Sequence, residues 1–489
     1  MSELHTTWSV QVEVLSPLHI GSGTELLLGY DLVPHGGRTY RVDEDALLEQ
    51  ALVQAESAGD AAMNQLLAGR PAAELLTDAD FQPGSHLFRY VMPGTMFTST
   101  PGAKAQEQIK DVHDRLYLPG SSLKGALRTV LAWGFYTRQD REPDLSRLRR
   151  SRSWASQDLE REIFGRDPNR DWLRGLRVED SQPLEPDGHL AMRTVRIYPT
   201  QTRDSAGLNV DVETVEPGTV FQTAITVDEY GFREDVARQL GWQGKRAWLG
   251  QLVTLGKEYA RERLLTEARF FSAPGSPQEV RGFYDGLVRQ LVEGELADDE
   301  FPLQVGWGTG WESKTLGSGL LRQDDVAFER MLNQYRMTKE RNREPGDPFP
   351  KSRTLALRGD QPAFPLGWVR VKLGGFVPGE RPEVAPPSPK EPAERPPAPP
   401  TAQLQRPEDL QPDQVLEGRV VNVVNFGAFV DVGVGQDGLV HISELAEGYV
   451  PSVESIVRVG QRIRVRVLNA ERRRGRWRIG LTMKGVDQP

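Results

Sequence analysis

The sequence contains no cysteine among its 489 residues. Disulfides, thiolate nucleophiles and cysteine-ligated zinc or iron–sulfur sites are therefore excluded. No apolar run approaches the roughly 20 residues that span a bilayer, and the first residues lack the basic and apolar regions of a signal peptide. The apolar and charged fractions are those of an ordinary globular protein. We therefore expect a cytoplasmic protein that makes no contact with a membrane.

An excess of positive charge is also missing, because the formal net charge is −9. The average hides local clusters, since arginines concentrate in residues 147–152 and near the C-terminus. Electrostatic fields decay within about 10 Å at ordinary salt, so a basic patch can bind phosphate on an acidic protein. Net charge alone neither supports nor excludes nucleic-acid binding.

Composition places one clear boundary. Residues 378–412 are rich in Pro, Glu, Ala and Arg, with adjacent prolines at 386–387, 396–397 and 399–400. Such a segment is typical of an extended, semi-rigid linker. We therefore predict four parts: an N-terminal domain at 1–205, a second domain at 206–377, the linker at 378–412, and a C-terminal domain at 413–489.

Strands interrupted by helices predict an α+β fold before the linker. Residues 8–15 alternate apolar and polar side chains, which indicates a half-buried strand that ends in a proline- and glycine-containing loop at 16–23. A helical pattern with one break is expected from 43 to about 76, and residues 81–114 are typical of a loop. Further strands are expected at 38–42, 176–180, 192–198, 218–228 and 303–305, and further helices at 242–271 and 277–293.

Residues 117–131 combine an apolar extended run, a Pro119-Gly120 turn and a helix that Ser121 or Ser122 can cap. Lys124 and Arg128 lie one turn apart, near a helix N-terminus that attracts anions. The apolar stripe of the helix is Leu123, Ala126, Leu127, Val130 and Leu131. The residues alone leave two interpretations open, a seat for phosphate and an ordinary strand-to-helix connection.

The C-terminal part has short β-rich runs, and its last arginines alternate with apolar residues. Arg462, Arg464 and Arg466 are separated by single apolar side chains, which puts three guanidinium groups on one face of a strand. Aromatic side chains beside arginines on a β-surface suit single-stranded nucleic acid, because bases stack on the rings and phosphates follow the cations.

Residues 418–420, 425–431 and 437–445 resemble the RNA-binding repeat of ribosomal protein S-one. The resemblance implies a five-stranded OB-fold barrel whose RNA-binding residues are Phe426, Phe429, His441 and an arginine near Arg473. Glu471 stands where that family often has Asp. A barrel that docks protein instead of RNA is the alternative.

Four further segments, in order, resemble the RAMP proteins of CRISPR systems: residues 15–23, 118–128, 305–315, and 350–354 with 365–368. Together they resemble one subfamily, the fifth Csm subunit of type III-A complexes. The resemblance implies a ferredoxin-like (RRM-related) core, in two tandem units, and a non-catalytic subunit without a cofactor or metal. It also implies that the subunit caps the complex near the 3′ end of the guide RNA and supports guide maturation.

The partners implied are CRISPR guide RNA, the other Csm-type subunits and host maturation nucleases. Glycine loops let an RNA backbone approach closely, and cations bind its phosphates. The guide-contacting residues expected from the resemblance are His19, Gly21, Ser22, Gly23, Ser121, Ser122, Lys124, Arg128, Gly308, Gly310 and Lys314.

Three other functions fit parts of the sequence. A RAMP ribonuclease could cut RNA through Asp31 with a metal, or through His19 as general base. A nucleotide hydrolase is suggested by residues 308–315, although Ser313 replaces the glycine that precedes the lysine of a P-loop. A protein-only scaffold would use Trp307 and Trp311 as interface anchors.

Overall fold

The computed structural model describes residues 4–58, 71–199, 209–338 and 349–376, and from the C-terminal part residues 410–411, 413–424, 427–434, 438–441, 444–446, 453, 456–458, 460–473 and 476–486. The chain divides into two compact units, residues 1–383 and 384–489. This division falls within the predicted linker, most of which lies outside the described residues.

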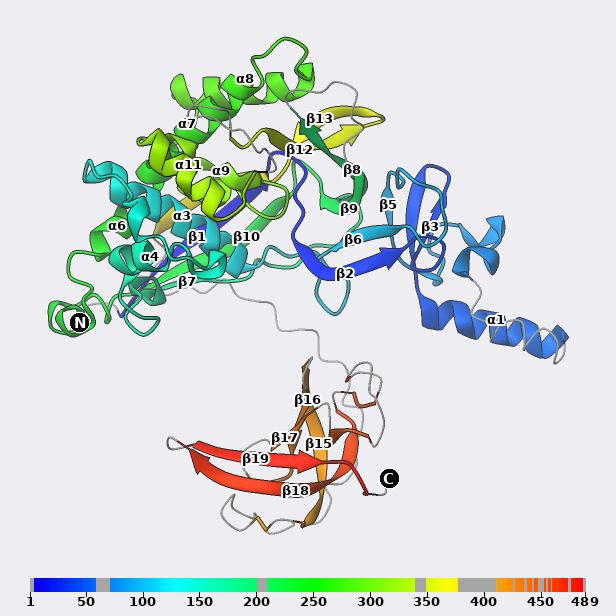
Figure 1. The fold of residues 1–489 in the computed structure, drawn as a ribbon. Coiled ribbons are helices and arrows are strands. Elements are labelled where there is room, and N and C mark those ends of the chain that lie inside the picture. The colour runs from blue at the N-terminus through cyan, green and yellow to red at the C-terminus, as the bar shows by residue number, and fades with distance from the viewer. Residues whose placement is uncertain are drawn as a thin grey trace. The chain divides into compact units, whose positions relative to one another are not determined.

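The first unit is built on a five-stranded antiparallel sheet in the order β11-β14-β1-β10-β7. Its strands are β1 His5–Val14, β7 Leu176–Val178, β10 Val220–Asp228, β11 Glu300–Gln304 and β14 Trp368–Phe376. Helix α3 (Gly120–Arg138) lies between β1 and β7 in the chain, and α7 (Leu252–Phe270) lies between β10 and β14. The order β14-β1-β10-β7 with these two helices is that of a ferredoxin-like βαββαβ unit, which confirms the expected core (Figure 1).

Strand β1 lies in the middle of this sheet, and its burial follows the predicted alternation. Val10, Val12 and Val14 are fully buried and belong to one hydrophobic core with Leu123 and Leu127 of α3. The two helices pack closely where α3 carries a glycine, because a Cβ at Gly134 would lie 2.9 Å from Leu255 of α7. The apolar stripe predicted for α3 is thus confirmed as the core face of the helix.

A second sheet has the order β13-β12-β8-β9-β6-β2. Its strands are β2 Gly21–Leu27, β6 Lys104–Gln108, β8 Leu190–Pro199, β9 Asn209–Val215, β12 Ser352–Arg358 and β13 Gln361–Pro365. Both sheets combine strands from before and after residue 205. The two sheets are therefore interleaved along the chain and do not correspond to two successive segments.

A small third sheet, β3-β4-β5, is formed by Leu32–His35, Arg38–Val42 and Phe88–Pro93. Helix α1 (Glu44–Ala58) follows β4, and the Asp43 carboxylate accepts a hydrogen bond from the Ala46 backbone N–H at 3.0 Å. In Figure 1 this sheet and α1 lie beyond the ends of β2 and β6, away from α3 and α7.

The remaining α-helices of the first unit are α4 Gln157–Phe164, α5 Glu234–Leu240, α6 Arg246–Gly250, α8 Gln278–Val292, α9 Gly310–Lys314, α10 Gly317–Leu321 and α11 Asp325–Gln334. Short 3-10 turns are η1 Ala72–Glu74, η2 Asp78–Asp80, η3 Leu145–Arg147, η4 Arg152–Trp154 and η5 Trp172–Gly175. Among the described residues, no helix combines the length and apolar character that crossing a bilayer requires.

The second unit is a closed five-stranded barrel in the order β15-β16-β17-β19-β18, which confirms the expected OB-like fold. Its strands are β15 Val415–Val424, β16 Gly427–Asp431, β17 Gly438–His441, β18 Arg462–Arg473 and β19 Arg476–Thr482. Ile463, Val465 and Val467 point into the barrel and are buried. The intervening arginines of β18 therefore face outward, as their alternation predicts.

Two local predictions are wrong. Residues 81–114 contain strands β5 and β6 instead of a continuous loop. Helix α3 begins at Gly120 after Pro119 and has no side-chain cap, so neither Ser121 nor Ser122 has the predicted role. The Asp180 carboxylate accepts the Gly120 N–H at 2.7 Å instead, which satisfies a free donor of the first turn from a distant residue.

Candidate nucleic-acid interface

The loop after β1 is anchored by a buried histidine. His19 is 2% exposed, and its Nδ1 donates a hydrogen bond to the Glu213 backbone carbonyl at 2.7 Å. The Trp307 ring meets the imidazole edge-on at 5.7 Å between centroids, and the Trp307 N–H donates to the His19 carbonyl at 2.7 Å. Burial lowers the pKa of His19. His19 thus joins the loop at residues 15–23 (the first loop) to β9 and to the loop at residues 305–310 (the glycine-rich loop). The geometry gives it a structural role.

The residues after His19 present backbone to solvent, as the glycines predict. Gly21, Ser22 and Gly23 are exposed at the start of β2, and Gly23 has a φ of 93° that favours glycine. The Ser22 hydroxyl donates to Glu107 at 2.8 Å and accepts from the Thr24 N–H at 3.0 Å. Contact of these exposed residues with RNA stays a prediction.

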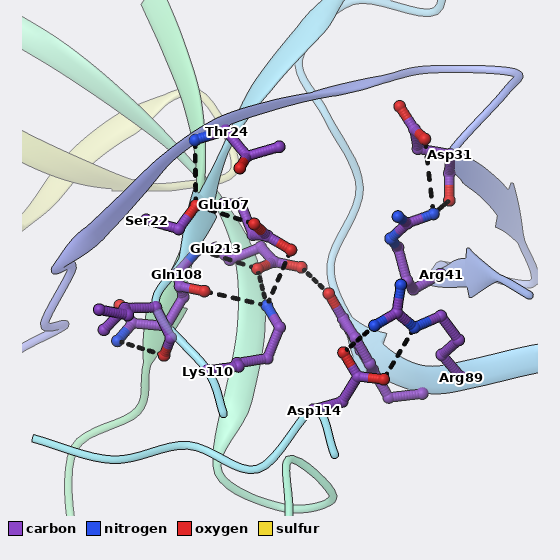
Figure 2. Close-up of polar contacts among 12 residues, drawn as sticks. Ser22, Thr24, Asp31, Arg41, Arg89, Glu107, Gln108, Lys110, Asp114 and Glu213 are labelled. Carbon is purple, nitrogen blue, oxygen red and sulfur yellow. Dashed lines mark hydrogen bonds and ion pairs between the residues drawn. The ribbon is translucent and has the colours of Figure 1, made fainter. Parts of the chain in front are cut away.

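Beneath this loop lies a buried ion pair that the sequence analysis did not single out (Figure 2). Glu213 of β9 is fully buried, and its Oε2 lies 2.5 Å from Nζ of Lys110, whose side chain is 4% exposed. The same oxygen accepts the Gln108 N–H at 2.9 Å, and Oε1 accepts the Tyr90 hydroxyl at 2.7 Å. Both carboxylate oxygens are therefore occupied, and they connect β9 to β5 and β6.

The network extends from this pair to the loop and to the surface. The Gln108 side-chain carbonyl accepts the Ile20 N–H at 2.8 Å, and the Gln108 backbone carbonyl accepts from Lys110 at 3.1 Å. Lys110 also lies 4.7 Å from the Tyr90 ring centroid. Burial, together with the Glu213 charge, raises the pKa of Tyr90 well above its usual value. Tyr90 is therefore held as a neutral donor, and the network fixes the base of the exposed loop.

The glycine-rich loop approaches other backbone closely where its glycines lie. Gly306 has a φ of 87°, and a Cβ there would come within 2.4 Å of the His19 carbonyl oxygen. A Cβ at Gly308 would lie 2.4 Å from Leu366, whereas Gly310 is open to solvent. The first loop and the glycine-rich loop are therefore adjacent, and Gly308 serves packing.

The helix α9 that follows this loop is held by a buried arginine. Arg263 of α7 is 2% exposed, and its Nη1 donates to the Glu312 carboxylate at 2.7 Å and to the Glu312 carbonyl at 3.1 Å. The same carboxylate accepts the Ser318 N–H at 2.9 Å. Ser313 donates to Gln304. The side chains that precede Lys314 are thus occupied inside the fold, which does not favour the P-loop interpretation.

The two cations of α3 are occupied by the protein itself. The Lys124 ammonium donates to the carbonyls of Leu173 and Leu176 at 2.8 and 2.7 Å, and burial lowers its pKa. Arg128 donates to Asp171 at 2.7 Å and lies 3.3 Å from the Glu160 carboxylate. The geometry therefore favours the structural interpretation of this helix start over a phosphate seat, and contact of either cation with RNA stays a prediction.

Asp31, the alternative catalytic residue, is held within a turn. Its Oδ2 accepts the Leu27 N–H at 2.6 Å, and Oδ1 lies 3.5 Å from the Arg41 guanidinium. Among the described residues, no group of three or more acidic or histidine side chains is placed to hold a metal ion. Asp31 therefore has a local structural role in this geometry.

The barrel brings its expected aromatic residues onto one outer face. Phe429 pairs with Leu439 and Gly427 with His441, so Phe429 and His441 are diagonal neighbours on β16 and β17. The buried Ala428, Val430 and Val440 occupy the opposite, inner face. Phe426 and the side chain of Arg473 lie outside the described residues.

Cations continue this outer face across the neighbouring strands. Arg419 of β15 is paired in register with Arg462 of β18 on one side and with Asp431 of β16 on the other. Arg464 lies 3.2 Å from Glu417, and Arg466 donates to the Gly485 carbonyl at 2.7 Å. A partly exposed phenylalanine, an exposed histidine and these arginines thus lie on the outer side of adjoining strands, and such groups suit a single strand of nucleic acid.

Comparison with known proteins assigns both units. The family model of the RAMP superfamily matches residues 11–313, and that of the S1 RNA binding domain matches residues 409–482. A chain of a Csm–crRNA–target RNA ternary complex from a type III-A CRISPR-Cas system is 25% identical, with a TM-score of 0.55 over 75% of this chain and 100% of that one. Csm5 of T. onnurineus shares the fold, with 22% identity and a TM-score of 0.50 over 73% of this chain and 99% of that one.

Curated relatives match over a short part of the chain. Protein YhgF of Escherichia coli K12 is 52% identical over 81 residues, which are 17% of this chain and 10% of that protein. Protein tex of Bordetella pertussis is 58% identical over 76 residues, which are 16% of this chain and 9% of that protein. The chain thus covers about a tenth of the length of these relatives.

The buried pair gives a first prediction. Glu213→Gln should lower the free energy of unfolding by about 3–5 kcal/mol, because the Lys110 charge is left buried without its partner. Lys110→Met combined with Glu213→Gln should recover part of this loss. Urea unfolding measures both values. Glu25→Gln is the matched control, since it breaks an exposed pair with Lys104 (44% and 60% exposed) and should leave the free energy of unfolding nearly unchanged. Equal losses at the two sites would contradict a structural role for the network.

His19 gives a second prediction, on pH. Its pKa is lowered in the folded state, so the unfolded chain binds the proton first as the pH falls. The stability contributed by the neutral ring is complete above the unfolded pKa of about 6.5 and declines below it. Between pH 7.5 and 5, the wild type should therefore lose more unfolding free energy than His19→Asn, whose amide can replace Nδ1 as donor. Identical losses would show that His19 is protonated equally in both states.

Proposed function

Because the chain belongs to the RAMP superfamily, we propose that it is a non-catalytic RNA-binding subunit of a type III-A CRISPR effector complex, acting in the cytoplasm. In this proposal it caps the complex near the 3′ end of the guide RNA and supports guide maturation together with host nucleases. Its partners are the guide RNA and the other Csm-type subunits. The barrel adds a second RNA-binding surface.

One observation carries the proposal. The match to a chain from a Csm–crRNA–target RNA complex spans the whole of that chain and three quarters of this one. The RAMP family model, which matches residues 11–313, includes both the first loop and the glycine-rich loop. The match of the barrel to the S1 RNA binding domain supports RNA binding independently.

The non-catalytic part of the proposal is supported by the geometry of the two alternative residues. A general base needs a ring nitrogen within hydrogen-bond reach of a substrate proton. His19 is buried between Glu213 and Trp307, and Asp31 is bonded to the Leu27 amide. Both side chains are hydrogen-bonded within the fold. The function that we propose for the exposed glycine loops is therefore recognition of RNA.

The assembly itself provides a test. When the complex is isolated through a tag on this chain, we expect guide RNA and the other subunits to co-purify. A chain ending at Phe376 retains the complete hydrophobic core of the first unit, which shares no residue with the barrel core. This shortened chain should also retain guide RNA. Guide-free preparations of both forms, recovered with the other subunits bound, would contradict guide binding by the first unit.

The barrel face provides a separate test with single-stranded RNA and the full chain. Phe429→Ala should weaken binding by about 5- to 150-fold without changing the salt dependence, because it removes a stacking surface. Arg462→Gln should reduce the slope of log K against log salt by about 0.7, the value for one phosphate contact. Leu468→Ala, at an exposed apolar position of β18, is the control and should change neither quantity. Unchanged affinity in the first two variants would favour a barrel that docks protein.

A further inference from the structure

The first unit contains a cavity of about 450 Å³, within the usual size of small-ligand sites. It is lined by residues of α3, α4, α9 and α11 together with the turn η4, and Figure 1 shows these helices gathered on one side of the unit. Its apolar wall includes Ala132, Leu148, Leu159, Ile163, Leu316 and Met331. The lining contains no residue of the first loop or of the barrel, and α9 joins the glycine-rich loop to the cavity wall.

A flat cation forms part of the wall. The Arg128 guanidinium lies 3.7 Å above the Phe164 ring, which also lines the cavity. Its N–H groups are directed to Asp171 and Glu160, and one of its faces is covered by Phe164. The other face of the guanidinium plane is the part of Arg128 that a ligand can contact. Guanidinium planes stack on nucleobases. Trp311 supplies an aromatic ring to the same cavity.

Two other cations in the lining have no acidic neighbour among the described residues. Lys314 and Arg152 form no ion pair or side-chain hydrogen bond within the part of the chain that the structure describes. Partial burial lowers the pKa of the Lys314 ammonium, with no compensating carboxylate. The acid in the lining is Glu160, which is engaged by Arg128 and by Ser156. The free charge at the cavity is thus positive.

We propose that this cavity binds one unstacked nucleotide of a single-stranded RNA. The base lies against the apolar wall, between the free face of Arg128 and the Trp311 ring. Its phosphate is bound by Lys314 and Arg152. The inference rests on the proposed RNA-binding function and assigns it a base-accepting site. An apolar peptide would leave both unpaired cations without a partner, whereas a nucleotide satisfies the apolar wall and the cations together.

The test uses the full chain and a single-stranded RNA that carries 4-thiouridine at one position at a time. Cross-linked peptides are identified by mass spectrometry. We expect one register of the RNA to cross-link to the peptides that contain Trp311 or Tyr335, both of which line the cavity. Ala155→Trp fills the cavity without changing charge and should reduce this cross-link at least tenfold, while cross-links to the barrel persist.

A second variant does not depend on repacking. Lys314→Gln removes the charge of a lining side chain and should reduce the salt slope of RNA binding by about 0.7, as loss of one phosphate contact predicts. Arg281→Gln, on an exposed part of α8 outside the lining, is the charge-matched control and should leave the slope unchanged.

The outcomes separate this inference from the proposed function. A wild-type chain that fails to bind RNA at all would overturn both. RNA that cross-links elsewhere on the chain, with no signal from cavity peptides or with the same signal in Ala155→Trp, would overturn the cavity alone. Protection of cavity peptides from hydrogen exchange by partner subunits in the absence of RNA would also overturn it, in favour of a protein occupant.

Discussion

The buried carboxylate of Glu213 is the constraint on which the arrangement of the exposed loops of the first unit depends. Desolvating a carboxylate and an ammonium costs several kcal/mol each unless both are paired and hydrogen-bonded. Here the lysine, a tyrosine hydroxyl and a backbone amide meet that requirement from two neighbouring strands. The carbonyl of the same residue binds His19, and the carbonyl of His19 binds Trp307. One buried acid thereby sets the positions of two glycine loops that come from opposite ends of the unit.

The sequence predicts which face a side chain lies on wherever apolar and polar residues alternate regularly along an element. The valines of β1, the leucines of α3 and the arginines of β18 all lie on the faces that their spacing predicts. Strand β6 was missed because its residues are mostly polar, and it is a strand through its pairing with β2 and β9. Such pairing is non-local, so no window of sequence contains it.

The sequence predicts which segments form the candidate site, but it does not predict the roles of several of the residues in them. The first loop and the glycine-rich loop do meet, but His19 is an internal anchor, and its partner Glu213 lies 194 positions away. Lys124 and Arg128 are predicted to bind RNA because the helix sequence contains none of their partners. Those partners lie in residues 160–176. The sequence of a helix shows that it carries a cation. Only the fold shows whether that cation is bound by other residues of the protein or is available to a ligand. The cavity beside Arg128 arises from four separated segments, so no motif could have indicated it.

The pairing of β1 has a consequence for synthesis on the ribosome. The strand that forms the middle of the core sheet is made first, yet Val14 pairs with Val369 and Trp8 with Phe376 on β14. At about 5–20 residues per second, roughly 20–70 seconds separate the appearance of the two strands. Throughout that interval the valine face of β1 lacks one of its neighbours, and β10 arrives first to cover the other edge. The nascent chain therefore carries an unpaired edge of β1 until its first unit is nearly complete, and such an edge is a template on which another strand can pair.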